Sequence, residues 1–320
     1  MPPEGDDAKL SGVLVVDKPE GVTSHDVVSR ARKSLGLKKI GHAGTLDPFA
    51  TGALVLLVGE GTKLSDYLME GRKTYLASVK LGEKTDTGDL SGEIIETAPF
   101  DNISLDDIKS VLPRFEGEIN QLPPMYSALK KNGVPLYKYA RRGEEVERAE
   151  RKVFIHSIRL LDFKLPHIEI EVSCSKGTYI RTLAEDISAA LGTRGHLVQL
   201  RRVGSGSLSI KEAVSFDDLA LRDNAVRAMR SLADSISSMP KIIVSNEGAE
   251  KIRNGARLIA GWIESYDLVE VKDEIAGDNI VRVLREDGSL LSISELITDE
   301  REYSKCSPLF EVAKSIRVFN

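Results

Sequence analysis

The chain has 320 residues, with 44 Lys and Arg against 49 Asp and Glu for a net charge of −5, and its hydrophobic content of 41% is ordinary for a globular protein. No apolar run approaches the ~20 residues that a membrane-spanning helix needs, which argues against a membrane protein of that kind. Two cysteines, Cys174 and Cys306, and five histidines without metal-ligand spacing argue against a disulfide framework and a zinc site. We therefore expect reduced thiols, a cytoplasmic location and no cofactor, in two domains or one large domain with an appendage.

The first 120 residues predict a mixture of strands and helices. A polar stretch with paired prolines at residues 1–10 predicts a flexible tail. Ser24 is expected to be a helix N-cap, because four apolar residues follow it at helical spacing before Gly36 ends the pattern. Apolar runs, alternation and the capping pair Ser104–Asp107 predict the other elements. In chain order these are the strand Gly12–Val16, the strand Ala53–Val58, the helix Thr62–Met69, the strand Thr74–Leu81 and a helix that begins after Ser104.

The stretch from Gln121 to Arg151 is rich in Pro, Gly and charge and has little sustained periodicity. Its part Lys130–Lys152 holds eight basic residues against four acidic ones, with two tyrosines among them. Basic residues interleaved with aromatics suit contacts to phosphates and bases. Glutamates that alternate with the arginines suit a solvated, salt-bridged face equally well. Beyond this stretch we expect strands at Lys152–Leu161 and His167–Ser173 and a helix over residues 183–191.

A domain boundary is predicted near Met239–Pro240, where the pattern changes to short strands. Residues 241–320 carry 11 Lys and Arg against 15 Asp and Glu, so most of the net negative charge lies there. Asp287–Gly288 is a strong hairpin signal. The strands expected in this small barrel-like module are Lys241–Val244, Asp267–Val271, Ile280–Leu284 and Leu290–Ile293. Because no regular βαβ repeat is present, the whole pattern predicts an α+β fold with a largely antiparallel sheet.

The segment Gly41–Gly52 concentrates three glycines, one histidine and one carboxylate just before an apolar strand. Glycine suits unusual dihedral angles or a close approach to a ligand, and Pro48 pushes Asp47 toward an extended conformation. A stiff loop that presents one acid is a platform for a nucleophile or a base. On spacing alone, a tight turn whose Asp bonds nearby backbone amides is the more common explanation.

This segment resembles the G-H-x-G-x-L-D-P-x-A-x-G loop of the TruB family of pseudouridine synthases. Six further blocks resemble the same family, in the same order, and the seven together span most of residues 11–210. The resemblance therefore does not depend on one short motif, which alone would carry a false-positive risk. The other blocks are Asp17–Gly21, Lys73–Tyr75, Gly82–Thr87, Pro124–Lys130, Cys174–Thr182 and Leu200–Arg202.

The resemblance implies a pseudouridine synthase catalytic domain at residues 11–240, with a mixed, largely antiparallel sheet flanked by helices. It implies a small PUA-like RNA-binding domain at residues 241–320, where the motif match is weaker. It also implies an activity, the isomerisation of uridine to pseudouridine at position 55 in the T loop of tRNA. This reaction moves the glycosidic bond from N1 to C5 of the base without a redox change, and the sequence contains no dinucleotide or P-loop motif.

Site residues follow from the same resemblance. Asp47 matches the family's nucleophile, although attack on C1′, attack on C6 and a glycal route all remain open. Arg181 matches a partner arginine, for which a bidentate pair would orient Asp47 and keep it ionised; an ordinary surface ion pair is the alternative. Tyr75 matches a catalytic tyrosine that also stacks on the flipped base. The other implied substrate-binding residues are His42, Tyr179 and Leu200.

The segment at about residues 125–151 resembles the family's thumb, which implies that it closes over the T arm of tRNA. Long irregular loops of this kind are often binding lids. We expect a monomer that binds tRNA, with no guide RNA and no membrane partner. The thumb residues expected to contact RNA are Lys130, Lys131, Tyr137, Arg141 and Arg142.

Three alternative functions stay open. The chain could be an RNA-binding or RNA-folding module in which the chemistry is minor. It could be a guide-RNA-dependent synthase inside a ribonucleoprotein, although relatives of that kind generally lack the thumb block. A glycosidase acting on small nucleosides would need a second carboxylate beside the first. Asp86 and Asp89 are candidates, but they match a loop of the family for which the resemblance implies a structural or RNA-facing role.

Overall fold

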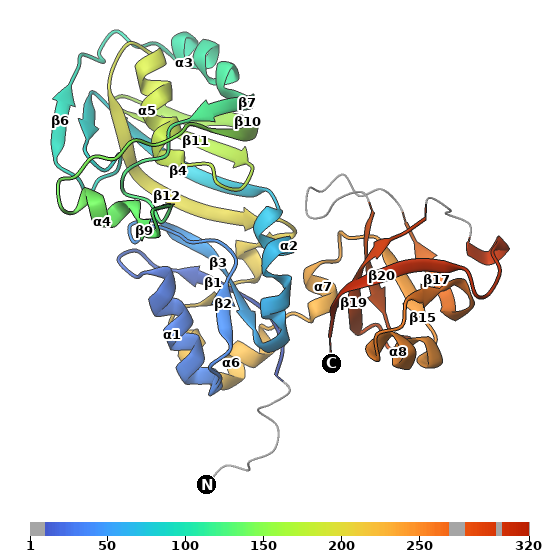
Figure 1. Ribbon diagram of the computed structural model, residues 1–320. Helices are drawn as coiled ribbons and strands as arrows, with labels where there is room; N and C mark the ends of the chain where they lie inside the picture. Colours follow the sequence, from blue (N-terminus) through green and yellow to red (C-terminus); the bar gives the residue numbers. More distant parts are fainter. Residues whose placement is uncertain (1–9, 269–278, 299–302, 320) are drawn as a thin grey trace.

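The computed structural model describes residues 10–268, 279–298 and 303–319, and its largest unit is a ten-stranded sheet (Figure 1). Its strands are β1 (Gly12–Lys18), β2 (Ile40–His42), β3 (Thr51–Val58), β4 (Lys73–Leu81), β7 (Gly117–Gln121), β10 (Arg151–Lys164), β11 (His167–Cys174), β12 (Gly195–Ser205), β13 (Leu208–Ser209) and β14 (Val214–Ser215). Their order is β14-β1-β3-β12-β4-β11-β10-β7, with β2 on β3 and β13 on β12. The pairs β1–β14 and β3–β12 are parallel and the others antiparallel, so the predicted α+β fold with a largely antiparallel sheet is confirmed.

Short helices and two small hairpins surround this sheet. The helices are α1 (Ser24–Leu35), α2 (Ser65–Glu70), α3 (Leu105–Val111), α4 (Leu136–Ala140), α5 (Ile180–Ala190), α6 (Arg222–Arg227) and α7 (Leu232–Ser235). The 3₁₀ helices are η2 (Gly59–Leu64), η3 (Leu112–Phe115), η4 (Ile210–Glu212) and η5 (Asp218–Ala220). The hairpins pair β5 (Glu83–Thr85) with β6 (Ile94–Thr97) and β8 (Lys130–Lys131) with β9 (Val134–Pro135). Among the described residues, no helix is long and apolar enough to cross a membrane.

The expected N-cap of α1 was wrong by one residue. Thr23 is the N-cap, because its hydroxyl accepts a hydrogen bond from the Asp26 amide (3.1 Å) while the Asp26 carboxylate accepts one from the Thr23 amide (3.0 Å). Ser24 is the first helical residue, and its buried hydroxyl bonds the backbone of Leu46 instead. The cap and the neighbouring loop are therefore fixed together.

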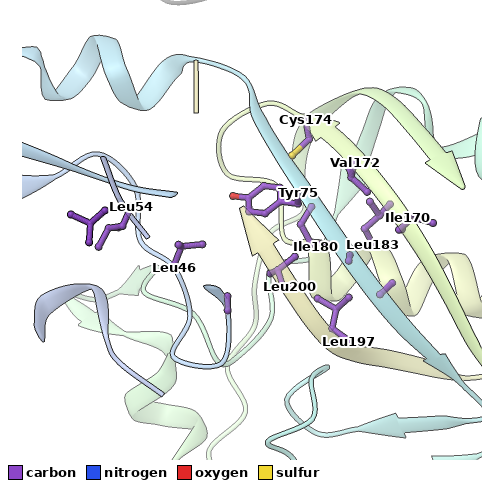
Figure 2. Close-up of a cluster of buried hydrophobic side chains, with 14 of the residues drawn as sticks. Leu46, Leu54, Tyr75, Ile170, Val172, Cys174, Ile180, Leu183, Leu197 and Leu200 are labelled. Carbon is purple, nitrogen blue, oxygen red and sulfur yellow. The ribbon is translucent and has the colours of Figure 1, made fainter. Parts of the chain in front are cut away.

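The main core lies between α5 and one face of the central strands. Four residues of α5 at helical spacing pack against apolar residues of β4, β11 and β12 (Figure 2). Strand β3 reads as an unbroken apolar run because both of its faces are covered. Leu54, Leu56 and Val58 join this main core, whereas Ala53, Val55 and Leu57 face a second one.

A second sheet begins after residue 240. Its order is β16-β20-β19-β18-β15-β17, and helix α8 (Asn246–Arg253) joins β15 to β16 along the chain. Of the predicted strand Asp267–Val271, Asp267 is the last residue of β17, and residues 269–271 lie outside the described residues. The strands are β15 (Lys241–Val244), β16 (Leu258–Ile259), β17 (Ile263–Asp267), β18 (Ile280–Leu284), β19 (Leu290–Leu296) and β20 (Glu311–Val318), with the 3₁₀ helices η6 (Ala260–Trp262) and η7 (Tyr303–Lys305).

The second sheet packs on the reverse face of β1 and β3. Leu284, Leu290, Ile293 and Phe319 share one apolar cluster with the outward-facing residues of those two strands and with α2. Lys63 Nζ adds a hydrogen bond to the Val318 carbonyl (2.8 Å). The two sheets therefore meet through a buried apolar contact.

Phe319 is 1% exposed within this contact. We predict that Phe319→Ala lowers the free energy of unfolding by about 3 kcal/mol, because deleting a buried aromatic ring removes its transfer energy and leaves a cavity. Urea denaturation followed by circular dichroism measures the change. The control is Phe310→Ala, since Phe310 is partly exposed. Equal losses in both variants would contradict this packing.

Candidate functional site

Asp47 lies in the loop that joins β2 to β3, and hydrogen bonds fix the loop on both sides of it. The Leu46 amide donates to the Ser24 hydroxyl (2.9 Å), and the Ser24 hydroxyl donates to the Leu46 carbonyl (3.1 Å). The Gly21 amide donates to the Pro48 carbonyl (2.8 Å), and the Ala50 amide closes a turn onto the Asp47 carbonyl (3.1 Å). The backbone that carries the carboxylate is thus held from α1 and from the turn after β1.

The side chain of Lys18 also holds this loop in place. Its side chain is fully buried at the end of β1, and its Nζ donates to the carbonyls of Pro19 (3.0 Å), Val22 (2.7 Å) and Pro48 (3.1 Å). Burial lowers the pKa of Lys18 to about 8, against the opposing effect of the Asp47 carboxylate. Lys18 therefore ties the turn after β1 to the residue that follows Asp47.

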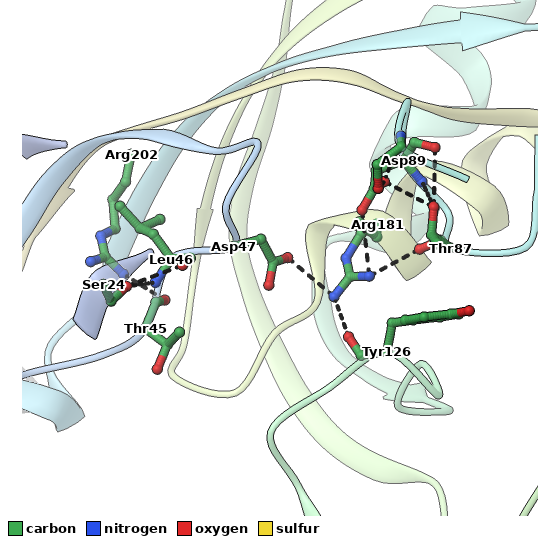
Figure 3. A network of polar contacts seen from close by, with 10 residues as sticks. Ser24, Thr45, Leu46, Asp47, Thr87, Asp89, Tyr126, Arg181 and Arg202 are labelled. Carbon is green, nitrogen blue, oxygen red and sulfur yellow. Dashed lines mark hydrogen bonds and ion pairs between the residues drawn. The ribbon is translucent and has the colours of Figure 1, made fainter. Parts of the chain in front are cut away.

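Arg181, in the first turn of α5, faces the Asp47 carboxylate (Figure 3). The Arg181 Nη2 lies 3.1 Å from Asp47 Oδ2 and also donates to the Tyr126 carbonyl (2.7 Å). The Arg181 Nη1 donates to the Thr87 carbonyl (2.9 Å). The expected bidentate pair is therefore absent here, because one nitrogen serves Asp47 and the other is used by Thr87.

Asp89 is buried beside Arg181. Its Oδ2 lies 3.6 Å from Arg181 Nη1, and both side chains are 5% exposed. Its Oδ1 accepts hydrogen bonds from the Thr87 hydroxyl (2.8 Å) and the Ser91 amide (2.9 Å). Asp86 is exposed and accepts a bond from the Glu93 amide (2.9 Å). Neither carboxylate is placed as a glycosidase's second acid, and Asp89 orients Arg181 instead.

Opposing effects set the protonation of Asp47. Its side chain keeps 38% of its surface accessible, yet the surrounding protein atoms desolvate it. This desolvation is the largest effect and raises the pKa of Asp47, and Asp89 raises it further. Arg181 and Lys18 lower it, but the pKa remains above its ordinary value. Asp47 therefore holds its proton more tightly than an exposed aspartate does.

Tyr75 and Leu200 lie side by side on β4 and β12, on the face that carries the main core (Figure 2). The Tyr75 side chain sits at the edge of the apolar cluster, with its hydroxyl directed toward the loop of Leu46. Burial raises the pKa of the Tyr75 hydroxyl, whereas the charge of Arg202 lowers it. Cys174, in the same core, has a pKa raised to about 12 by burial and is an inert thiol.

Two further candidate residues lie at the ends of secondary-structure elements. Tyr179 is the N-cap of α5, and its amide donates to Gln121 Oε1 (3.0 Å). His42 ends β2, and burial lowers the pKa of its imidazole, so the ring is neutral at pH 7. The buried His42 Nδ1 has no hydrogen-bond partner among the described residues.

The basic segment is more regular than its sequence predicts, since it forms the β8–β9 hairpin and the one-turn helix α4. Lys130 is exposed on β8, and Lys131 Nζ donates to the Glu147 carbonyl (2.7 Å). The Arg141 guanidinium lies 5.5 Å from the Tyr137 ring centroid. Arg142 and Glu144 form an exposed ion pair (4.0 Å). The five residues expected to contact RNA therefore lie in one small unit. The first turn of this unit contacts Arg181 through the Tyr126 carbonyl.

Two family models match most of the large sheet's sequence. The model of the TruB family pseudouridylate synthase N-terminal domain matches residues 32–180, and that of the tRNA pseudouridylate synthase B C-terminal domain matches residues 181–239. The chain is 46% identical over 263 residues to tRNA pseudouridine synthase B of Burkholderia lata, which covers 82% of this chain and 81% of the relative. It is 42% identical over 296 residues to that of Burkholderia pseudomallei, covering 90% and 97%.

Solved structures show the same architecture. A chain of a Cbf5–Nop10–Gar1 complex superposes with a TM-score of 0.73 at 25% identity, covering 96% of this chain and 84% of the other. A chain of an H/ACA ribonucleoprotein bound to a substrate RNA containing 2′-deoxyuridine gives a TM-score of 0.74 at 23% identity, covering 97% and 85%. At 23% identity, the second similarity supports the shared fold alone.

We predict that Asp89→Asn lowers the pKa of Asp47. The substitution removes a negative charge that shares the Arg181 guanidinium, so the ionised form of Asp47 becomes easier to reach. Titration of the Asp47 carboxyl carbon by ¹³C NMR measures the shift. Asp86→Asn is the matched control and should leave the titration unchanged. A raised or unchanged pKa in Asp89→Asn would show that the two carboxylates are not coupled.

Proposed function

The chain belongs to the TruB family of pseudouridylate synthases, and we propose that it isomerises the uridine at position 55 in the T loop of tRNA as a stand-alone enzyme. The relatives named tRNA pseudouridine synthase B, at 42–46% identity, support the substrate class. The observation that carries the proposal is the ion pair between Asp47 and the buried Arg181 at 3.1 Å. It places a partly accessible carboxylate, oriented by a fixed cation, on a loop tied down at both ends.

The proposed reaction breaks the N1–C1′ bond of the target uridine and forms a C5–C1′ bond, while a proton leaves C5 and N1 gains one. Atoms and electrons balance without a redox partner. Asp47 acts on the sugar or on the base, and the routes through C1′, C6 or a glycal all remain compatible with its position. Arg181 stabilises the carboxylate in its ionised form, against the effect of desolvation.

The other site residues receive proposed roles from their positions. A base must leave its stack before a side chain reaches C1′ or C6, and aromatic rings compensate the lost stacking. Tyr75 and Leu200, adjacent on β4 and β12, suit one wall of a pocket for the flipped uracil. Tyr179, two residues before Arg181, is proposed to line the same site. His42 is neutral and has an unpartnered ring nitrogen, which suits a hydrogen bond to RNA.

We propose that the small unit formed by residues 125–151 contacts the T arm of the tRNA. Exposed lysines and arginines beside tyrosines match the chemistry of phosphates and unstacked bases. The presence of this unit, together with the named relatives, favours an enzyme that works without a guide RNA. The second sheet, residues 241–320, is proposed to be a PUA-like domain.

The first test is the release of tritium from C5-labelled uridine in an unmodified tRNA transcript. Wild-type protein should release tritium from a single site, and Asp47→Asn should reduce the single-turnover rate to background, because the variant loses the carboxylate but keeps its shape. A transcript in which only the T-loop uridine is changed should release nothing. Binding of tRNA without tritium release from wild type would instead identify an RNA-binding or RNA-folding module.

A second test addresses the role of residues 125–151. Replacing Lys130, Arg141 and Arg142 by Ser should weaken tRNA binding and reduce the slope of log K against log salt by about 2, because phosphate contacts release counterions. Fluorescence anisotropy at several salt concentrations gives this slope. The matched control replaces the exposed residues Lys33, Lys109 and Arg227 by Ser, with the same change in net charge. Equal slopes for the two triple variants would rule out this assignment.

A further inference from the structure

Arg202 is the largest fully buried side chain among the described residues, and no role described above accounts for it. It lies on β12, two residues after Leu200, and is 1% exposed. Its Nε donates to the Ala53 carbonyl (2.7 Å), its Nη2 to the Gly44 carbonyl (3.0 Å) and its Nη1 to the Thr45 carbonyl (3.5 Å). Gly44 and Thr45 belong to the Asp47 loop, and Ala53 lies near the start of β3; Figure 3 shows Arg202 beside Thr45.

This arginine sits where two halves of the large sheet meet. Strands β3 and β12 share two register pairs, Thr51–Arg201 and Gly52–Arg202, whereas β12 and β4 share nine. Asp47 belongs to the β2–β3 half, and Tyr75 and Leu200 belong to the β4–β12 half. The relative position of the carboxylate and the tyrosine therefore depends on this narrow junction.

Arg202 bridges the junction through both its backbone and its side chain. Its backbone faces Gly52 on one side and Tyr75 on the other. Its side chain holds the loop on the β2–β3 half through the three carbonyls. Its guanidinium also interacts with the Tyr75 hydroxyl and lowers the pKa of that group, and among the described residues no carboxylate accepts its hydrogen bonds. A buried cation without a counter-ion costs desolvation energy, so stability alone is a poor reason for its presence.

Two glycines in or next to the loop lie close to Arg202. Gly52 has φ +100°, and a Cβ there would lie 2.2 Å from the Arg202 carbonyl oxygen. Gly44 has φ +106°, and a Cβ there would lie 3.6 Å from Arg202 Nη1. Any side chain at residue 52 would push β12 away from the loop. Gly52 thus allows β3 and β12 to approach each other at Arg202, whereas at Gly44 the positive φ is what favours glycine.

From this geometry we propose, building on the function proposed above, that Arg202 is a positioning residue that holds the Asp47 loop in register with Tyr75 and Leu200 across the junction. It acts through the backbone of the loop. Being 1% exposed, it does not present its guanidinium to RNA. Its removal should therefore slow the chemical step and leave RNA binding in place, because small misplacements of a reacting group cost about 10²-fold in rate.

The test compares Arg202→Met, Arg202→Lys and Arg201→Met. Arg201 is the matched control, since it is the neighbouring arginine, is 40% exposed, and its side chain bonds Asp17 (2.7 Å) and the Thr51 hydroxyl (3.4 Å) but none of the carbonyls that Arg202 holds. For each variant, fluorescence anisotropy gives the Kd for a T-arm RNA and tritium release gives the single-turnover rate. Circular dichroism establishes a temperature at which each variant is folded.

We expect Arg202→Met to bind RNA with a Kd within about threefold of Arg201→Met but to react about 10²-fold more slowly. Arg202→Lys keeps the charge and can reach some of the carbonyls, so its rate should lie between the two. If Arg202→Met does not fold, the intermediate rate and unchanged Kd of Arg202→Lys decide. A rate within about threefold of the control, or a loss of binding that parallels the loss of rate, would overturn the assignment. If wild type and Arg201→Met both release no tritium, the proposed function fails rather than this inference.

Discussion

One guanidinium, that of Arg181, joins three segments that are far apart in the sequence. It bonds the loop of Asp47, the turn that contains Thr87 and Asp89, and the first turn of the basic segment at Tyr126. Leaving a buried charge without partners costs free energy of folding. A buried arginine that is hydrogen-bonded to several segments therefore holds those segments in place. The position of Asp47 is therefore coupled to the segment proposed to grip RNA, since both share the same Arg181 Nη2.

Positive charge is concentrated inside a protein whose net charge is negative. Lys18 and Lys73 are buried, each has a pKa lowered to about 8 by burial, and both donate to backbone carbonyls, as Arg202 does. Carbonyl oxygens solvate these cations without cancelling their charge. The local field around the Asp47 loop and Tyr75 is thus opposite in sign to the overall charge of −5. An acidic isoelectric point does not argue against a polyanionic substrate for such a site.

The sequence predicted the family, the fold class and the strands of the core well, and the site less completely. Continuous apolar runs such as β3 are visible because both faces are buried. Strand β12 was not predicted, because Arg201 and Arg202 interrupt its apolar pattern and the burial of Arg202 depends on carbonyls distant in sequence. The role of Asp89 could not be seen either, since its partner lies 92 residues away and nothing local marks it. The order within residues 125–151 comes from tertiary contacts that composition does not reveal.

Strands β1 and β3 each contribute alternate residues to two different cores. Leu14 and Val16 face the main core, which includes apolar residues of α1, while Val13 and Val15 face the second sheet, and β3 divides its residues in the same way. Neither core can lose these strands without exposing the other, because the side-chain period of a strand is two. The two sheets are therefore not independent modules on a tether, and heat or denaturant should melt them in one cooperative transition. Recombination that exchanged the second sheet for an unrelated one would also have to restore the packing of β3, the strand that follows the Asp47 loop.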